Sequence, residues 1–233
     1  MTYDNYFKFR QITPEDYSNH ALPAYLSNLF DPSQTLRILD FGCGFGQTLD
    51  ALRRVGHAAV EGVDIEPSAI EHCRKLGFIC HDGNKEANFF ESNEGIYDYV
   101  IMGHVLEHLP KSEMIPHLEK IRSLLKSEGK LILSVPNAQS NTAAYWRYED
   151  FTHNYLFTSG SIYYVLASAG FQNITYLDID CTEGLAGLKK LTRKFFLFLY
   201  RIKYVFWNKI TASAVHAPSP MIFSYEIKVM AGK

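Results

Sequence analysis

The sequence predicts an α/β domain built on a doubly wound, mostly parallel sheet of seven strands. Seven short apolar runs alternate with segments of helical periodicity from residue 36 onward. Such alternation predicts parallel strands with helices on both faces of the sheet. A chain of 233 residues has the size of one domain, with room for an appendage.

The first three strands are expected at residues 36–42, 57–65 and 78–82. The first of them, LRILDFG, is a short apolar run ending in Asp-x-Gly, which is typical of a buried strand. The helices between them, 46–56 and 66–77, each end at a glycine, and the second has a proline in its first turn.

Four further strands complete the predicted sheet, at residues 97–104, 130–137, 173–180 and 221–232. A helix precedes the fifth strand, because leucine and isoleucine side chains within 118–125 mark one of its faces. Another helix is expected at 161–170, where apolar residues recur at i, i+3, i+4 and i+7.

Charge and composition exclude several classes of function. The chain has 23 Lys and Arg against 25 Asp and Glu, a net charge of −2, so it lacks the basic excess of nucleic-acid-binding proteins. The four cysteines, Cys43, Cys73, Cys80 and Cys181, form no CxxC pair, which argues against a zinc or disulfide framework and for reduced thiols. The start of the sequence does not resemble a signal peptide. We therefore expect a cytoplasmic protein without a nucleic-acid partner.

A glycine-rich loop follows the first strand, at the sheet edge where doubly wound folds bind ligands. Gly42, Gly44 and Gly46 lack Cβ atoms, so the turn can adopt positive φ and a ligand can approach the backbone. Their GxGxG spacing differs from the GxGxxG of dinucleotide loops, because Gln47 stands at the sixth position, and no Walker GK[ST] is present. A glycine-rich turn without a ligand is the alternative.

Asp64 closes the second strand at the same edge of the sheet. An acidic side chain there can accept hydrogen bonds from both hydroxyls of a ribose, a charge-assisted contact worth about 1.5–3 kcal/mol. Ribose recognition alone leaves nicotinamide cofactors and other nucleosides open.

In order along residues 36–180, the segments DFGCGFG, GVDI, HDG, YDYVIMGHVLEHL and GKLILSVPN resemble the class I S-adenosylmethionine-dependent methyltransferases. The resemblance implies S-adenosylmethionine as the cofactor and a Rossmann-like sheet whose last two strands form an antiparallel hairpin. Here that hairpin carries a helical insertion at 183–215. Residues 1–35 would then be a segment that covers the cofactor, and 36–233 the methyltransferase domain.

The same resemblance implies which residues contact the cofactor. Its methionine end would lie against the first motif, with Asp40, Gly42, Cys43, Gly44 and Gly46. Asp64 would bind the ribose and Ile65 the adenine ring, and Asp82, followed by Gly83, would meet the adenine amino group. The reactive end would be lined by Met102, Gly103 and His104.

Methyl transfer to oxygen needs in-line positioning and a base, and a well-placed base contributes roughly 10²–10⁴ in rate. Histidine suits this role because its pKa lies near neutral pH. His104 follows the fourth strand within HVLEHL, which resembles a segment of ubiquinone-pathway O-methyltransferases where the Glu-His pair can serve a divalent metal. No DH or DN partner motif follows, so no metal is predicted. Glu107 and His108 are expected to cap the next helix.

Residues 137–161 are too long and too aromatic for a plain connection, and such loops usually carry function. The stretch WRYEDFTHNYLFT resembles its equivalent in methyltransferases of bacterial surface-polysaccharide and O-antigen gene clusters, where it closes over the acceptor. His153 is the predicted base, with His104 as its rival. The predicted acceptor contacts are Trp146, Arg147, Glu149 and Tyr155. The alternative is an aromatic loop that only packs over the sheet.

Residues 186–210, within the insertion, combine apolar and cationic side chains. Six apolar residues run from Phe195 to Tyr200, and seven Lys or Arg lie between 189 and 209. The run is too short and too interrupted by charge to span a bilayer, but it suits a helix lying in a membrane interface. A helix packed on the domain or on a second subunit is equally open.

The predicted function is methyl transfer from S-adenosylmethionine to a small-molecule or saccharide acceptor, at oxygen, in cell-surface polysaccharide biosynthesis. Two alternatives stay open: a nicotinamide-dependent oxidoreductase on the same kind of sheet, and a non-catalytic methyltransferase-like binding module. The expected location is the cytoplasm, with peripheral membrane contact or self-association through 186–210.

Overall fold

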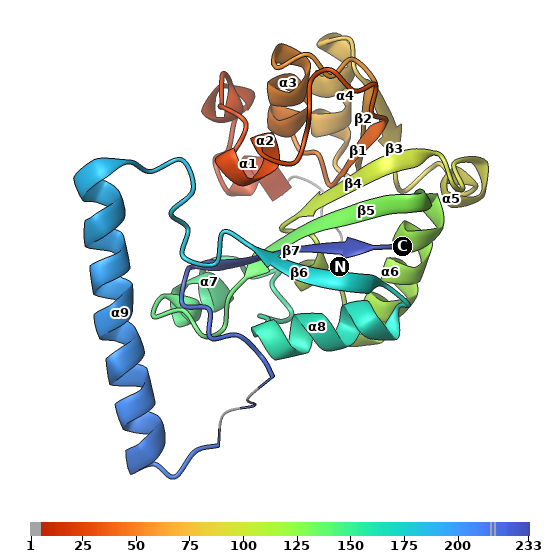
Figure 1. Cartoon of the computed structure of the whole chain (residues 1–233). Helices are drawn as coiled ribbons and strands as arrows, with labels where there is room; N and C mark the ends of the chain where they lie inside the picture. Colours follow the sequence, from red (N-terminus) through yellow and green to blue (C-terminus); the bar gives the residue numbers. More distant parts are fainter. Residues whose placement is uncertain (1–5, 215, 217) are drawn as a thin grey trace.

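A single seven-stranded sheet forms the centre of the molecule (Figure 1). The computed structural model describes residues 6–214, 216 and 218–233. The strands are β1 (Ile38–Phe41), β2 (Val60–Asp64), β3 (Ile79–Asp82), β4 (Tyr97–Gly103), β5 (Leu125–Pro136), β6 (Gln172–Leu177) and β7 (Glu226–Gly232). Their order across the sheet is β3-β2-β1-β4-β5-β7-β6.

Strands β1 to β5 are parallel, and β7 runs antiparallel to both of its neighbours, β5 and β6. The predicted doubly wound sheet with an antiparallel hairpin is therefore confirmed. Because β7 is reversed, its first residue, Glu226, pairs with Pro136 at the carboxyl end of β5. The start of β7 thus shares the edge at which ligands of such sheets bind.

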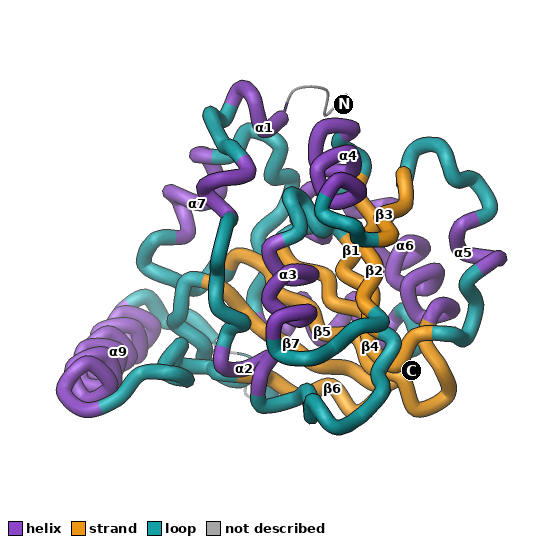
Figure 2. The backbone as a smooth tube through the Cα atoms, turned by 90° about the horizontal axis from the view of Figure 1, so that it is seen from above, coloured by secondary structure: helices purple, strands orange, loops and turns teal. Residues whose placement is uncertain are grey.

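Helices cover both faces of the sheet (Figure 2). One face carries α2 (Ala24–Ser27), α3 (Gln47–Arg54) and α4 (Pro67–Lys75), and the other carries α5 (Phe89–Ser92), α6 (Lys111–Leu124) and α8 (Ser159–Ser168). Each face has its own apolar cluster, and the consecutive residues Ile38 and Leu39 belong to opposite clusters. Alternate side chains of β1 are therefore buried on both faces, as expected for a central parallel strand.

Several boundaries differ from the expected ones. β5 begins at Leu125, directly after α6, whereas β7 begins only at Glu226. The residues before β7 lie outside the ladder, since the Asn137 amide donates to the carbonyls of Ile222 and Ser224, each at 2.8 Å. Six short elements were not predicted: α1 (Tyr6–Phe9), two 3-10 helices (Pro14–Tyr17 and Leu106–His108), α2, α5, and α7 (Ala143–Glu149) inside the aromatic segment.

The predicted helical insertion is α9 (Gly187–Ile210), which lies at the side of the domain (Figure 1). None of its residues is buried. Within the described part of the chain, no helix combines the length and apolar character needed to cross a bilayer.

Candidate active site

The glycine loop after β1 is fixed in a conformation that requires glycine. Gly42 and Gly46 both have φ of 84°, and a Cβ at Gly42 would lie 2.2 Å from a methyl carbon of Val105. The N–H groups of Gly42 and Cys43 donate to the carbonyl of Val63, at 2.8 and 3.0 Å. The loop is therefore tied to β2 and has no space for a side chain at its first glycine.

Asp64 joins the end of β2 to this loop. One carboxylate oxygen accepts the Gly44 N–H at 2.7 Å, and the other accepts those of Ile65 and Glu66 at 2.8 and 2.9 Å. Burial raises the pKa of Asp64, and these three N–H groups partly offset the rise. Ile65 itself is 37% exposed, so its side chain is available to a flat apolar group.

Asp82 and Gly83 lie next to Asp64, because the sheet pairs Asp64 with Asp82. The Asp82 carboxylate accepts the Asn84 N–H at 3.1 Å and pairs with Lys85 at 3.0 Å. The Gly83 N–H donates to the Asp64 carbonyl at 2.9 Å. The predicted ribose and adenine residues are thus assembled into one surface by neighbouring strands.

A cleft of about 520 Å³ runs from the glycine loop across the ends of β4, β5 and β7. Residues 20–26 of the N-terminal segment form one wall, and the sheet edge supplies Asp40, Gly42, Cys43, Gly103, His104, Ser134, Glu226 and Lys228. Burial, with the charge of Asp64 as a second cause, raises the pKa of Asp40 to about 7. A cation bound in the cleft would stabilise the charged form of this acid.

The side chains of two predicted cofactor-binding residues point away from the cleft. Met102 is 0% exposed and belongs to the apolar cluster of the opposite face, so its backbone alone remains for a ligand. The Cys43 thiol is buried beneath the loop, 3.6 Å from the Cys80 sulfur.

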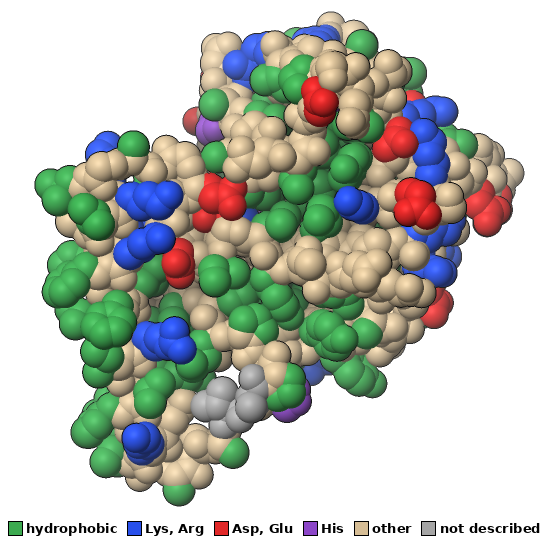
Figure 3. Space-filling model, in the orientation of Figure 1, with side chains coloured by type: hydrophobic (Ala, Val, Ile, Leu, Met, Phe, Trp, Pro, Cys, Tyr) green, Lys and Arg blue, Asp and Glu red, His purple; other side chains and the backbone are tan. Residues whose placement is uncertain are grey.

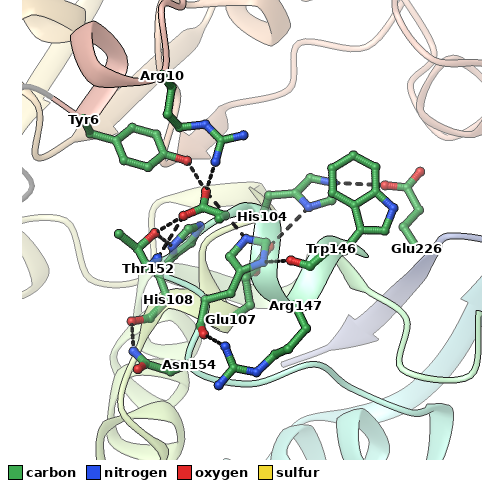
Figure 4. A network of polar contacts seen from close by, with 12 residues as sticks. Tyr6, Arg10, His104, Glu107, His108, Trp146, Arg147, Thr152, Asn154 and Glu226 are labelled. Atoms are coloured by element: carbon green, nitrogen blue, oxygen red, sulfur yellow. Dashed lines mark hydrogen bonds and ion pairs between the residues drawn. The ribbon is translucent and has the colours of Figure 1, made fainter. Parts of the chain in front are cut away.

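His104 occupies the cleft between two carboxylates (Figure 4). Its Nδ1 lies 3.2 Å from Glu107 and its Nε2 lies 3.0 Å from Glu226. Burial lowers the pKa of His104, but the two carboxylates outweigh it and raise the pKa to about 10. The side chain is 47% exposed, and the backbone has φ of 54°, unusual outside glycine. His104 is therefore held as a cation at neutral pH, open to a ligand.

His153 is 7% exposed and does not belong to the described residues that line the cleft. Its Nδ1–H donates to the Trp146 carbonyl at 2.7 Å, and its Nε2 lies 3.8 Å from Asp150 and 3.9 Å from Glu107. Arg147 donates to the His153 carbonyl. These contacts close α7 and the residues after it into a compact loop.

The four predicted acceptor residues do not converge on one point. The Trp146 ring lies 6.1 Å from that of Tyr225, a cleft residue. Arg147 holds the loop, and Glu149 is exposed. Tyr155 packs against Phe157, and Lys111 lies over its ring at 4.3 Å.

Asp150 and Glu226 are site residues that the sequence reasoning missed. The Asp150 carboxylate accepts the Tyr6 hydroxyl at 2.6 Å and pairs with Arg10 at 2.7 Å, which joins the N-terminal segment to the aromatic loop. Burial opposes ionisation, but hydrogen bonds from Thr152 and Tyr6 and the charge of Arg10 lower the pKa of Asp150 to about 2. Glu226 reaches the cleft only because β7 pairs with β5, a tertiary feature that no local signal in the sequence gives.

The expected capping role of Glu107 and His108 is wrong. Helix α6 begins after Pro110 without a side-chain cap. Glu107 is 0% exposed and pairs with His104, and one of its oxygens has no hydrogen-bond partner. Ligand atoms of Glu107, His108 and His153 lie within 4.8 Å of one another, as do those of Cys43, Cys73 and Cys80. Both groups bring together residues whose spacing in the sequence carries no metal motif.

Comparisons with known proteins agree with this geometry. A sequence model described as a methyltransferase domain matches residues 11–176. The ubiquinone biosynthesis O-methyltransferase of Cereibacter sphaeroides is 31% identical over 117 residues, 48% of this chain and 46% of that protein. The chain thus spans about half the length of the curated relatives it matches.

Solved structures share the fold. A SAM-dependent methyltransferase from Archaeoglobus fulgidus is similar with a TM-score of 0.66 and 19% identity, covering 98% of this chain and 99% of that one. The 1,6-didemethyltoxoflavin-N1-methyltransferase of Burkholderia thailandensis, solved with S-adenosylhomocysteine, has a TM-score of 0.56 and 17% identity, covering 98% of this chain and 84% of that one.

Proposed function

The chain belongs to the methyltransferase-domain family, and from this premise we propose that it methylates a hydroxyl of a small-molecule acceptor, a saccharide or saccharide-like compound. The predicted family, fold class and cofactor, S-adenosylmethionine, are confirmed by the family match and the solved neighbours. The observation that carries the proposal is the cleft that continues from the glycine loop to His104 and Glu226.

The residues present fit this cofactor. The glycine loop lines the cleft with Gly42 and Cys43, and Asp64 is held at the end of β2 by the Gly44 N–H. Asp40, an acid whose pKa is raised by burial, favours a ligand with positive charge in the cleft. When bound, S-adenosylmethionine supplies a methyl group on a sulfonium, which is already a good electrophile. The protein then has to position the acceptor and remove its proton.

We assign proton removal to His104, the rival in the sequence analysis, because it lines the cleft whereas His153 is buried behind it. Glu107 and Glu226 orient the ring of His104 and raise its basicity. The neutral form of His104 is scarce at pH 7, but it is a strong base when formed. His153 acts as a positioning residue that fixes the loop carrying Trp146.

A saccharide acceptor is supported by the walls of the cleft. Tyr225 lines the cleft beside Glu226, and the Trp146 ring lies 6.1 Å from that of Tyr225. Aromatic rings next to a carboxylate suit a polyhydroxylated ligand. Arg147, Glu149 and Tyr155 would contact the acceptor only if the loop moved. A role in cell-surface polysaccharide biosynthesis rests on the loop resemblance, and a cytoplasmic location on the cysteine pattern.

Calorimetry with S-adenosylmethionine, S-adenosylhomocysteine and NAD tests the cofactor site. We expect the first two to bind and NAD to be silent. Asp64→Asn should weaken binding by about tenfold or more, because it removes a charge-assisted contact. Asp98→Asn is the matched control, since the Asp98 carboxylate also accepts a backbone N–H, from Arg37 at 2.8 Å. Asp98 lies near the amino end of β4, away from the ends of the strands that form the cleft. NAD binding would favour the oxidoreductase alternative.

Transfer of tritiated methyl groups tests the acceptor class. Nucleotide sugars and lipid-linked sugars are compared with catechols under the same conditions. Labelling of the sugars supports the proposal, and labelling of catechols alone refutes the saccharide assignment. Cofactor binding without transfer to any acceptor in a wide panel would favour the non-catalytic module.

A further inference from the structure

Helix α9 contacts the domain along one narrow line. Its half-buried residues are Leu197, Tyr200, Tyr204 and Asn208. The Tyr200 hydroxyl donates to the Gln139 carbonyl at 3.2 Å, and the Gln139 amide donates to Tyr204 at 3.3 Å. The rings of Tyr200 and Tyr204 lie about 5 Å from that of Phe223. These contacts orient α9 on the domain but bury none of its side chains.

The opposite side of α9 is a continuous apolar stripe. It consists of Leu188, Leu191, Phe195, Phe198, Ile202 and Phe206, whose exposures range from 51% to 75%. At 3.6 residues per turn these positions fall within an arc of about 80° that points away from the contact line. Six large apolar side chains in one exposed row mark an interaction surface rather than ordinary scatter.

Cations surround this stripe, and no acid accompanies them. Between Gly187 and Ile210 the helix has seven Lys or Arg and no Asp or Glu. Only Lys209, in the last turn, falls within the arc of the stripe. Figure 3 shows hydrophobic side chains along the outer, left-hand edge of α9 and blue Lys and Arg side chains beside them, on the part of the helix nearer the domain.

We propose that α9 lies flat on an anionic lipid surface, with its apolar stripe inserted between the headgroups. An amphipathic helix with a cationic polar side is the usual form of such an anchor. Pairing with a second α9 would bring two rows of cations together without any carboxylate on either helix, which disfavours a dimer through this face. Charge complementarity thus favours lipid over a second copy.

The position of α9 also implies the class of acceptor, an inference that rests on the proposed function. The segment leading into α9 lines the cleft with Asp178, Cys181, Glu183 and Leu185, and Arg193 of α9 does so as well. Docking of α9 therefore places the cleft beside the lipid surface. The acceptor is then an amphiphile whose polar group reaches the cleft while its apolar part stays in the bilayer.

Vesicle sedimentation of the full chain tests the docking. Phosphatidylcholine vesicles with one third phosphatidylglycerol are compared with phosphatidylcholine alone, at low and high salt. We expect binding to the anionic vesicles that weakens with salt. Changing Lys194, Arg201 and Lys203 to Gln should weaken partitioning roughly 100-fold, at about fivefold for each cation.

Phe195→Ser with Phe198→Ser should weaken partitioning by more than about tenfold. The matched control changes Tyr163 and Tyr164 of α8 to Ser, which are similarly exposed at 53% and 67%. Equal loss in this control, or equal binding to neutral vesicles, would overturn the proposal. A dimer in light scattering that the two Phe changes convert to monomer would assign the stripe to self-association instead.

Cofactor affinity separates the two proposals. The α9 variants should bind S-adenosylmethionine like the original chain, because they lie outside the glycine loop. Failure of the original chain to bind the cofactor would remove the proposed function and leave the vesicle result standing.

Discussion

Replacing Glu226 by Gln removes one of the two carboxylates that hold His104. The amide keeps the size of the side chain and can still accept a hydrogen bond, so the change acts mainly on charge. The pair of carboxylates raises the pKa of His104 from 6.5 to about 10. Loss of one should remove more than half of this net rise, because burial still lowers the pKa, and bring the pKa to about 8 or below.

This change has consequences for both stability and rate. A histidine whose folded pKa is raised stabilises the fold fully below pH 6.5, and the contribution is lost as pH rises toward about 10. Because His104 is half exposed, we expect the loss in Glu226→Gln to be only about 1 kcal/mol after solvent screening. If His104 is the base, the rising limb of kcat/KM should also move from about pH 10 to about pH 8.

The assay is a pH profile of kcat/KM, with the His104 titration followed by NMR. Near pH 7.5 the neutral fraction of His104 is about 100-fold larger in Glu226→Gln than in the original chain. A base of lower pKa removes a proton more slowly, so we expect kcat/KM to increase by only about tenfold. His104→Gln should abolish the limb. A uniformly lower rate with an unmoved limb would refute His104 as the base, even if NMR shows the lowered pKa.

Three further predictions use independent contacts. Gly42→Ala should abolish cofactor binding, measured by calorimetry, because the added Cβ would lie 2.2 Å from Val105. Gly77→Ala is the control, since Gly77 has a similar φ but open space around it. In thermal melts this control should lose only about 1–2 kcal/mol of stability, from backbone strain. Tyr6→Phe should raise KM several-fold with little change in kcat if the Asp150 contact closes the site, and equal losses in both would contradict this. Activity should survive dialysis against EDTA, and a loss restored by a divalent cation would instead assign a metal to Glu107 and its histidine neighbours.

The succession of strands and helices along the chain, the glycine loop and Asp64 were accessible from the sequence because each depends on local pattern. Short apolar runs predict strands, and glycines that the loop needs for positive φ appear in the sequence as a recognisable spacing. Glu226 was not accessible, because its role depends on the antiparallel insertion of β7 beside β5. Asp150 was hidden for a similar reason, since its partners Tyr6 and Arg10 come from a segment more than 100 residues earlier.

The direction of individual side chains was also not predictable from the sequence. In a continuous strand Met102 and His104, two residues apart, would share a face. His104 instead follows the end of β4 with φ of 54°, whereas the Met102 side chain packs into the apolar cluster. His153 looked like the better base because it lies in the aromatic loop. Its carbonyl and ring contacts instead turn it inward, and only tertiary packing decides between the two histidines.

The place of β7 between β5 and β6 has a consequence for how the protein is made. During synthesis the glycine loop, Asp64 and His104 leave the ribosome long before Glu226. Within the described sheet β6 is the edge strand and β7 is its neighbour, so β6 has no partner strand until β7 arrives. Contacts of such large sequence separation form late and slowly. A nascent chain therefore has its glycine loop before it has the carboxylate that tunes His104, and the charge state of His104 becomes a reporter of the last step of folding.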